Sequence, residues 1–137
     1  MFYLSKIING RINVPEMEYL PVTASETFKA GEALVLSSGK LTKASGTTKP
    51  TYIAAKDYVA PASGAELLPC FRVEKNMVFR VPVTFSSTPV ALVLGTKVTL
   101  HTDGLGVTDV TTSGVATIVD TLSAGSTTGD EIEVIIE

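Results

Sequence analysis

The chain is poor in the residue types on which most enzyme sites, metal sites and disulfide frameworks depend. Its 137 residues include one cysteine, one histidine and no tryptophan. One cysteine excludes an intrachain disulfide, so stability must come from packing or assembly. One histidine excludes every site that needs two imidazoles and most transition-metal sites. We therefore predict no cofactor and no metal.

Charge is also scarce and unevenly placed. Charged residues make up 18% of the chain, and the formal net charge is −3. Nucleic-acid binders carry clustered basic residues, and no basic stripe appears here, so no nucleic-acid partner is expected. Residues 1–80 hold 10 Lys or Arg against 7 acidic residues, whereas residues 81–137 hold Lys97 alone against 7. Opposed charge of this kind favours docking between neighbouring subunits.

Long hydrophobic runs are absent as well. The apolar N-terminus, residues 1–9, is short and carries Lys6, so it is expected to be neither a signal peptide nor a membrane span. No membrane partner is predicted. Cys70 fits a small buried hydrophobic residue better than a reactive thiol.

Strand patterns dominate what is present. No window of a dozen residues keeps an apolar stripe at helical spacing without meeting Gly, Pro or a Thr-rich run, so no long helix is expected. Short β-rich segments bounded by turn residues are frequent instead. The expected strands are Tyr19–Val22, Ala33–Ser37, Lys40–Ala44, Thr51–Lys56, Leu67–Val73, Met77–Thr84, Lys97–His101, Val115–Asp120 and Glu131–Ile136.

Turn signals join several of these strands. Ser38-Gly39 and Asp103-Gly104 are typical of hairpin turns, because Gly tolerates the positive φ that tight hairpins require. Lys75-Asn76 is predicted to join its flanking strands in the same way. Pro82 predicts that the strand from Met77 is an edge strand or ends there.

An internal repeat with a period near 64 residues organises the pattern. Gly31-Glu-Ala-Leu-Val-Leu and Gly95-Thr-Lys-Val-Thr-Leu each open a unit of strand, hairpin, strand, loop, strand, long loop and strand. Four short strands cannot bury a useful core alone, but two copies packed together can. We predict an all-β chain, a β-barrel or β-sandwich built from two related β-modules. The expected parts are an N-terminal arm at 1–22, a first module at 23–84 and a second at 85–137, in one compact domain.

No arrangement of catalytic residues emerges. His101 could in principle join Asp103 or Asp109 and a serine, but no G-x-S-x-G elbow exposes a nucleophile. The loop Ser38-Gly39-Lys40-Leu41 fails as a phosphate loop, because Leu41 stands where Ser or Thr is needed and strands flank it. Asp130, Glu131 and Glu133 fit a solvated strand face better than a cation site. The sequence predicts a protein that is not an enzyme.

Several segments resemble a known family. These are Gly10-Arg-Ile-Asn-Val-Pro-Glu, Thr23-Ala-Ser-Glu-Thr-Phe-Lys-Ala-Gly-Glu-Ala-Leu-Val-Leu, Gly39-Lys-Leu-Thr-Lys-Ala and Pro50-Thr-Tyr-Ile-Ala-Ala. They resemble small proteins encoded among the head-assembly genes of tailed bacteriophages, over the chain from about Asn9 onward. The resemblance implies a capsid decoration or cement protein and supplies no catalytic residues.

The N-terminal arm is the candidate binding element. It is more apolar than a disordered tail should be, so we expect its side chains to bury against this domain or a neighbour. The candidate residues for binding the capsid or another partner are Phe2, Tyr3, Leu4, Ile7, Ile8 and Ile12.

We therefore expect a structural virion protein on the capsid exterior, made in the host cytoplasm. The expected partners are the major capsid protein and further copies of the chain in a homotrimer. The alternatives are another phage structural module, from the tail or baseplate, and a glycan-binding β-module. The glycan-binding hypothesis is the weaker one, because tryptophan is absent and the four tyrosines are scattered.

Overall fold

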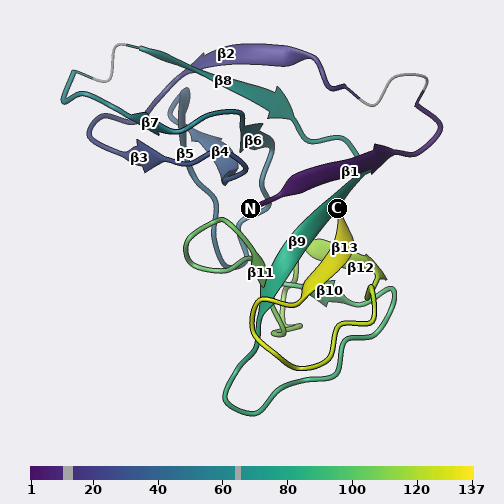
Figure 1. Cartoon of the computed structure of the whole chain (residues 1–137). Helices are drawn as coiled ribbons and strands as arrows, with labels where there is room; N and C mark the ends of the chain where they lie inside the picture. The colour runs from purple at the N-terminus through teal and green to yellow at the C-terminus, as the bar shows by residue number, and fades with distance from the viewer. Residues whose placement is uncertain (11–13, 64–65) are drawn as a thin grey trace.

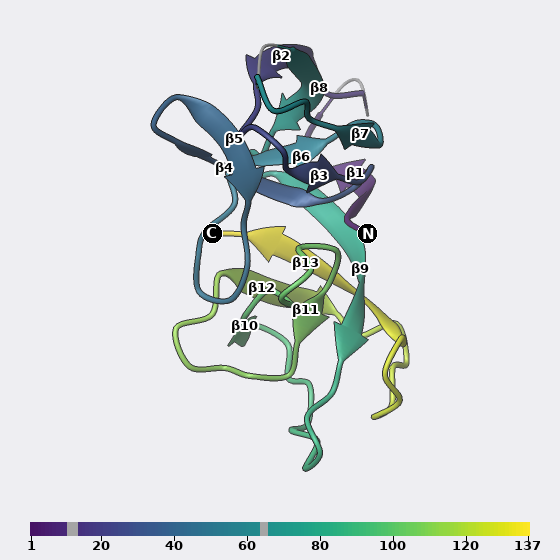
Figure 2. The same ribbon diagram turned by 90° about the vertical axis from the view of Figure 1, so that its left-hand side faces the viewer.

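The protein is built around two larger β-sheets, which lie one above the other in Figures 1 and 2. A computed structural model describes residues 1–10, 14–63 and 66–137, and these residues contain strands but no helix. The all-β class is therefore confirmed. The strands form open sheets in a sandwich-like arrangement rather than a closed barrel.

The first sheet contains five strands in the order β2-β8-β6-β4-β5, all antiparallel to their neighbours. Their bounds are β2 Met17–Pro21, β4 Ala33–Ser37, β5 Lys40–Lys43, β6 Tyr52–Ala54 and β8 Leu67–Arg72. One parallel bridge, Val22 to Leu41, links the two ends of this sheet. A separate two-stranded ribbon, β3 Thr27–Phe28 with β7 Tyr58–Val59, lies beside it.

The second sheet follows the order β1-β9-β13-β12-β10, and β11 pairs in parallel with β9. Its strands are β1 Tyr3–Ile7, β9 Met77–Thr84, β10 Lys97–Val98, β11 Val107–Thr108, β12 Ala116–Asp120 and β13 Glu131–Ile136. The sheets group the strands differently from the predicted modules. β9 of the predicted first module pairs with β13 of the second, and β1 of the predicted arm pairs with β9.

The predicted repeat appears in the backbone hydrogen bonds. Five bonds of the first sheet region recur 64 residues later with donor and acceptor preserved. The recurring pairs, donor N–H first, are Gly31 to Ala54 and Gly95 to Ile118, Glu32 to Lys29 and Thr96 to Val93, Thr51 to Leu34 and Val115 to Val98, Ala54 to Glu32 and Ile118 to Thr96, and Val73 to Thr51 and Glu137 to Val115. Two related β-modules are thus confirmed.

The repeat begins one strand earlier than the sequence pattern predicts. Residues 21–25 and 82–86 both read Pro-Val-Thr-x-Ser. The first motif begins at the last residue of β2, and the second begins two residues before the end of β9. Both strands pair with the last strand of their repeat in the same register, since Pro21 lies opposite Leu67 and Pro82 opposite Glu131. We call residues 17–73 the first repeat and 78–137 the second; β1 lies outside both.

The two predicted glycine turns have the required backbone. Ser38 and Gly39 both have positive φ, 50° and 77°, and join β4 to β5, while Gly104 has a φ of 69°. The prediction of a hairpin at Lys75-Asn76 is wrong, because β8 and β9 belong to different sheets. A polar turn signal specifies a change of chain direction, but it does not specify that the flanking strands pair.

Two hydrophobic clusters form the core. The smaller lies within the first repeat, around Phe28, Leu34, Leu41 and Leu68. The larger fills the second sheet around Phe79, Ile118 and Ile132, and it also includes Ala33, Ala44 and Ile53 of the first repeat. Because buried residues of both repeats share this cluster, the two repeats stabilise each other.

Candidate docking surface

The structure places five of the six predicted binding residues, and these five lie in three different environments. Phe2 is buried, and its ring packs edge-on against Phe79 with 6.0 Å between centroids. Leu4 and Ile7 are partly buried against the larger core cluster. Tyr3 and Ile8 are 60% and 47% exposed. Ile12 lies outside the described residues.

This division follows from the strand geometry of the N-terminus. Successive side chains of a strand point to opposite faces, so Phe2 and Leu4 face the core while Tyr3 faces solvent. A register shift between Leu4 and Lys6 marks a bulge, after which Ile7 faces the core again. Tyr3 and Ile8 therefore have accessible side chains, and the partner-binding role of the six residues stays a prediction.

The N-terminal segment contacts both repeats. The Phe2 N–H donates to the carbonyl of Gly31 at 2.8 Å, and Met1 lies directly over Gly31, where an added Cβ would be 2.5 Å from the Met1 Cβ. Residues 3–7 pair with β9, and the hydroxyl of Ser5 donates to Glu133 at 2.8 Å. The segment thus joins the first repeat to the second.

Exposed apolar side chains gather on and beside the N-terminal segment. Met1, Tyr3, Val14 and Met17 are 56%, 60%, 73% and 42% exposed. They border a depression of about 340 Å³ whose lining includes Ile53 and Phe71. We call Met1, Tyr3, Val14 and Met17 the N-terminal apolar surface. Exposed apolar groups gathered around a hollow are typical of protein interaction sites.

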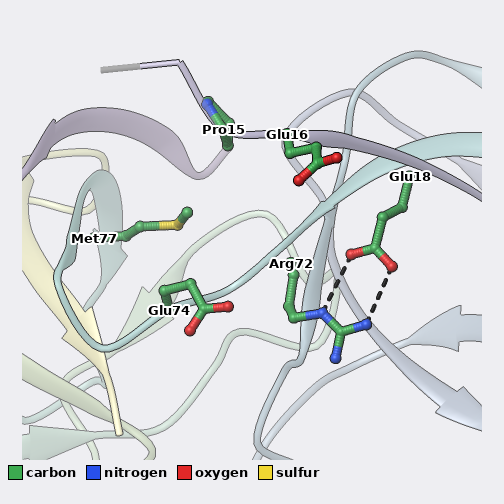
Figure 3. Close-up of a pocket in the computed structure, with 6 residues that line it drawn as sticks. All are labelled: Pro15, Glu16, Glu18, Arg72, Glu74 and Met77. Atoms are coloured by element: carbon green, nitrogen blue, oxygen red, sulfur yellow. Dashed lines mark hydrogen bonds and ion pairs between the residues drawn. The ribbon is translucent and has the colours of Figure 1, made fainter. Parts of the chain in front are cut away.

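Figure 3 shows an acidic pocket at the start of β2, and Pro15 lines both this pocket and the depression described above. Its volume is about 440 Å³, and its lining is Pro15, Glu16, Glu18, Arg72, Glu74 and Met77. Arg72 binds Glu18 through Nε at 3.2 Å and Nη2 at 3.1 Å, and its guanidinium lies 5.3 Å from the centre of the Tyr52 ring. The bond to Glu18 raises the pKa of Arg72. Three carboxylates against one guanidinium leave the pocket lining negative.

The described residues contain no group of three or more His, Cys, Asp or Glu side chains placed to hold a metal ion. His101 is half-buried, and its Nδ1 lies 2.9 Å from Oδ1 of Asp103. Burial alone would raise the pKa of Asp103, but the Leu105 N–H and His101 outweigh it, and the pKa is lowered. Glu131 pairs with Arg80 at 3.0 Å, and Glu133 pairs with Lys6 at 3.6 Å.

Cys70 is fully buried in the first repeat, and burial raises the pKa of its thiol to about 11. It behaves as the small buried hydrophobic residue that was predicted. In the part of the chain that the structure describes, no helix has the length and apolar character needed to cross a membrane.

The fold is that of a tandem β-repeat protein with exposed apolar side chains gathered at its N-terminal segment. No protein-family model matches the chain, and no curated protein sequence matches it either. Among solved structures, it is similar to the crystal structure of the head fiber gp8.5 N base of bacteriophage phi29, with 16% sequence identity and a TM-score of 0.55. The similarity covers 89% of this chain and 95% of that one, and at this identity it shows a shared fold.

Proposed function

We propose that the chain is a non-enzymatic structural protein of a tailed-phage head, bound to the outer surface of the shell as a decoration or cement protein. The observation that carries the proposal is the fold shared with a phage head fiber base over nearly the full length of both chains. The family resemblance of the sequence supports the same setting. The partner is the major capsid protein, and the protein attaches as a homotrimer at a local threefold of the lattice.

The chemistry of the molecule supports this function. A decoration protein must fold without disulfides in a reducing cytosol, and this chain forms two hydrophobic clusters, with its one cysteine free and buried in the smaller of them. It must also present a surface to a preformed lattice. The N-terminal apolar surface supplies exposed apolar groups next to an acidic pocket, a combination that suits docking on a surface with apolar and basic groups.

The test is to mix the purified chain with heads of the same phage that lack it, pellet the heads, and measure bound protein by quantitative gel. We expect saturable binding and a higher shell melting temperature, because a ligand that binds only the assembled shell stabilises it. Tyr3→Ser and Val14→Ser should weaken binding at least about tenfold, the loss expected when an apolar anchor leaves an interface. Val59→Ser is the matched control, since Val59 is 71% exposed on β7, outside this surface.

Absence of saturable binding to heads would contradict the function. Equal losses in all three variants would contradict the assigned surface.

A further inference from the structure

The two repeats differ at one sheet edge. In the second repeat, β1 pairs antiparallel with β9 over Met77 to Arg80. The equivalent residues of the first repeat, by the shared Pro-Val-Thr-x-Ser motif, are 16–19 at the start of β2. β2 ends its sheet, and no strand among the described residues pairs with the outer edge of residues 16–19. Figures 1 and 2 both show β2 at the outer limit of the molecule.

The hydrogen-bond pattern shows which backbone groups face this open edge. Within β8, Pro69 accepts a bond from Ala55 N–H, and Val73 N–H donates to Thr51, so odd-numbered residues of this strand bond toward β6 and its flanks. Even-numbered residues of β8 therefore bond toward β2, where Cys70 lies opposite Glu18 and Leu68 opposite Leu20. The N–H and C=O groups of Met17 and Tyr19 consequently point outward.

The same alternation holds where the edge is filled. Val83 N–H donates to Asp130, so odd-numbered residues of β9 bond toward β13. Even-numbered residues, Val78 and Arg80, face β1, in agreement with the bond from Ile8 N–H to the carbonyl of Asn76. Val78 and Arg80 are the equivalents of Met17 and Tyr19. Pro21 and Pro82 lie two residues beyond Tyr19 and Arg80, so their backbone nitrogens face the same edge of each strand. β1 pairs with β9 only as far as Arg80, so the missing N–H of each proline breaks no ladder bond.

The side chains along the open edge indicate what it would bind. Met17 and Tyr19 are 42% and 62% exposed on one face. Glu16 and Glu18 lie on the other, in the acidic pocket with Glu74 (Figure 3). β1, which fills the equivalent edge, is an apolar strand with one base, Lys6. Pairing of β2 with β2 of a second copy would bring like charges together, which disfavours that occupant.

We propose that the outer edge of β2 is a strand-acceptor site that takes an extended segment of the shell protein, one carrying Lys or Arg among apolar residues. The segment adds antiparallel to Met17 and Tyr19, as β1 adds to Val78 and Arg80. This inference rests on the proposed function and adds a second contact with the shell, next to the N-terminal apolar surface. Main-chain hydrogen bonds supply affinity in such strand addition, and side-chain pockets supply specificity.

The test uses the full chain and a synthetic peptide of its own residues 2–8, the sequence that fills the equivalent edge. Amide hydrogen exchange is followed by NMR for Met17 and Tyr19. We expect saturating peptide to slow exchange of both amides at least about tenfold, as new ladder bonds require. Tyr19→Pro removes an outward N–H that bonds to none of the described residues, and it should weaken peptide binding at least about tenfold. Tyr19→Ala, which keeps the N–H, is the control and should bind within about threefold.

Unchanged exchange at Met17 and Tyr19, or protection that appears only at β1 and β9, would overturn the proposal. Protection that rises with protein concentration alone would overturn the occupant in favour of a second copy. The assay contains no heads, so its failure leaves binding to heads untouched. In the head-pelleting assay, a Tyr19→Pro variant that folds normally yet binds as Tyr19→Ala does would overturn the shell segment as occupant.

Discussion

The first and second repeats share a backbone ladder but differ in what covers them. Gly31 and Gly95 both have a positive φ, near 80°, and make equivalent hydrogen bonds. Met1 packs over Gly31, whereas the space at Gly95 is open, with nothing within 4 Å of an added Cβ. Conversely, β1 covers the edge of β9, whereas no strand among the described residues covers that of β2. One N-terminal segment therefore completes a different face of each repeat, and the faces left open are the candidates for partners.

In each repeat a carboxylate joins the loop after the first strand to a later strand by hydrogen bonds. We call these contacts the carboxylate ties. The carboxylate belongs to the loop in one repeat and to the strand end in the other. In the first repeat, Glu26 lies on the loop and accepts bonds from Thr42 Oγ1 and Lys43 N–H, both at 2.8 Å. In the second, Asp109 follows β11 and accepts bonds from the loop residues Ser86 and Val90. Both repeats therefore hold this loop through a carboxylate, although the carboxylate lies at opposite ends of the contact.

The largest effect is expected where the N-terminal segment enters the core. Phe2→Ala should lower the free energy of unfolding by about 3 kcal/mol, because it removes a buried ring and leaves a cavity beside Phe79. Tyr3→Ala, one residue away but exposed, should change it by less than about 0.5 kcal/mol. Urea unfolding followed by circular dichroism measures both. Similar values for the two variants would mean that the segment does not cover the second repeat as described.

A smaller effect is expected from the carboxylate ties. Asp109 is buried and accepts three bonds, from Ser86 N–H, Ser86 Oγ and Val90 N–H. Asp109→Ala should cost about 2 to 3 kcal/mol, and Glu26→Ala about 1 kcal/mol, since Glu26 is only half-buried. Chemical denaturation of both variants ranks the two ties. A larger loss of stability in Glu26→Ala than in Asp109→Ala would contradict this ranking of the two ties.

The Asp109 tie should also depend on pH. Burial alone would raise the pKa of Asp109, but the bonds from Val90 and Ser86 outweigh it and lower the pKa below 3.8. The stabilisation is therefore present above about pH 3.8 and is lost as pH falls through the lower folded value. Comparing the chain with Asp109→Ala from pH 2 to 7, we expect the stability difference to shrink on the acid side. A constant difference would contradict the assignment.

The opposite pH dependence is expected at Glu32, whose equivalent in the second repeat is Thr96. Burial raises the pKa of Glu32 above 4.5, although the Lys29 N–H and Lys43 oppose this, and its Oε1 accepts no hydrogen bond. Stability should therefore fall as pH rises from about 4.5 through the folded pKa. Glu32→Gln keeps an acceptor for the Lys29 N–H and should remove this slope, an effect of about 1 kcal/mol or less. If Glu32→Gln kept the same pH dependence of stability, another titrating group would have to cause it.

The smallest expected difference is between the unfolding midpoints of the two repeats. Because both contribute buried residues to one cluster, they should unfold together. Cys70 is buried in the first repeat, so thiol labelling in increasing urea reports its exposure. The labelling midpoint should coincide with that from circular dichroism of the whole chain. Labelling at clearly lower urea would show that the first repeat opens alone.

Much of this architecture was predictable because strand alternation and glycine turns are local signals. The strands at Ala33–Ser37, Met77–Thr84 and Glu131–Ile136 appear with the predicted bounds. The two-residue strands β3, β7 and β11 were missed, because pairs of that length carry no period. β1 was predicted as an arm, since its pairing with β9 is a tertiary choice that no local pattern encodes.

The candidate surface was only partly predictable for a related reason. Tyr3 and Ile8 were named as binding residues together with Phe2, because apolar character alone does not separate a core face from an exposed one. Met17 and Tyr19 were missed. The repeated Pro-Val-Thr-x-Ser motif was the available signal, since it aligns β2 with β9. The topology of the described residues is then needed to see that β9 has a covering strand and β2 has none.

The central claim is that two equivalent edges differ in one covering strand. Amide exchange of the free full-length chain, resolved by residue, tests it most directly. We predict strong protection at Val78 and Arg80, whose backbone groups face β1, and fast exchange at Met17 and Tyr19, while Glu18 and Leu20 stay protected by β8. Equal protection at the four matched amides, or fast exchange at Val78 and Arg80, would contradict the account.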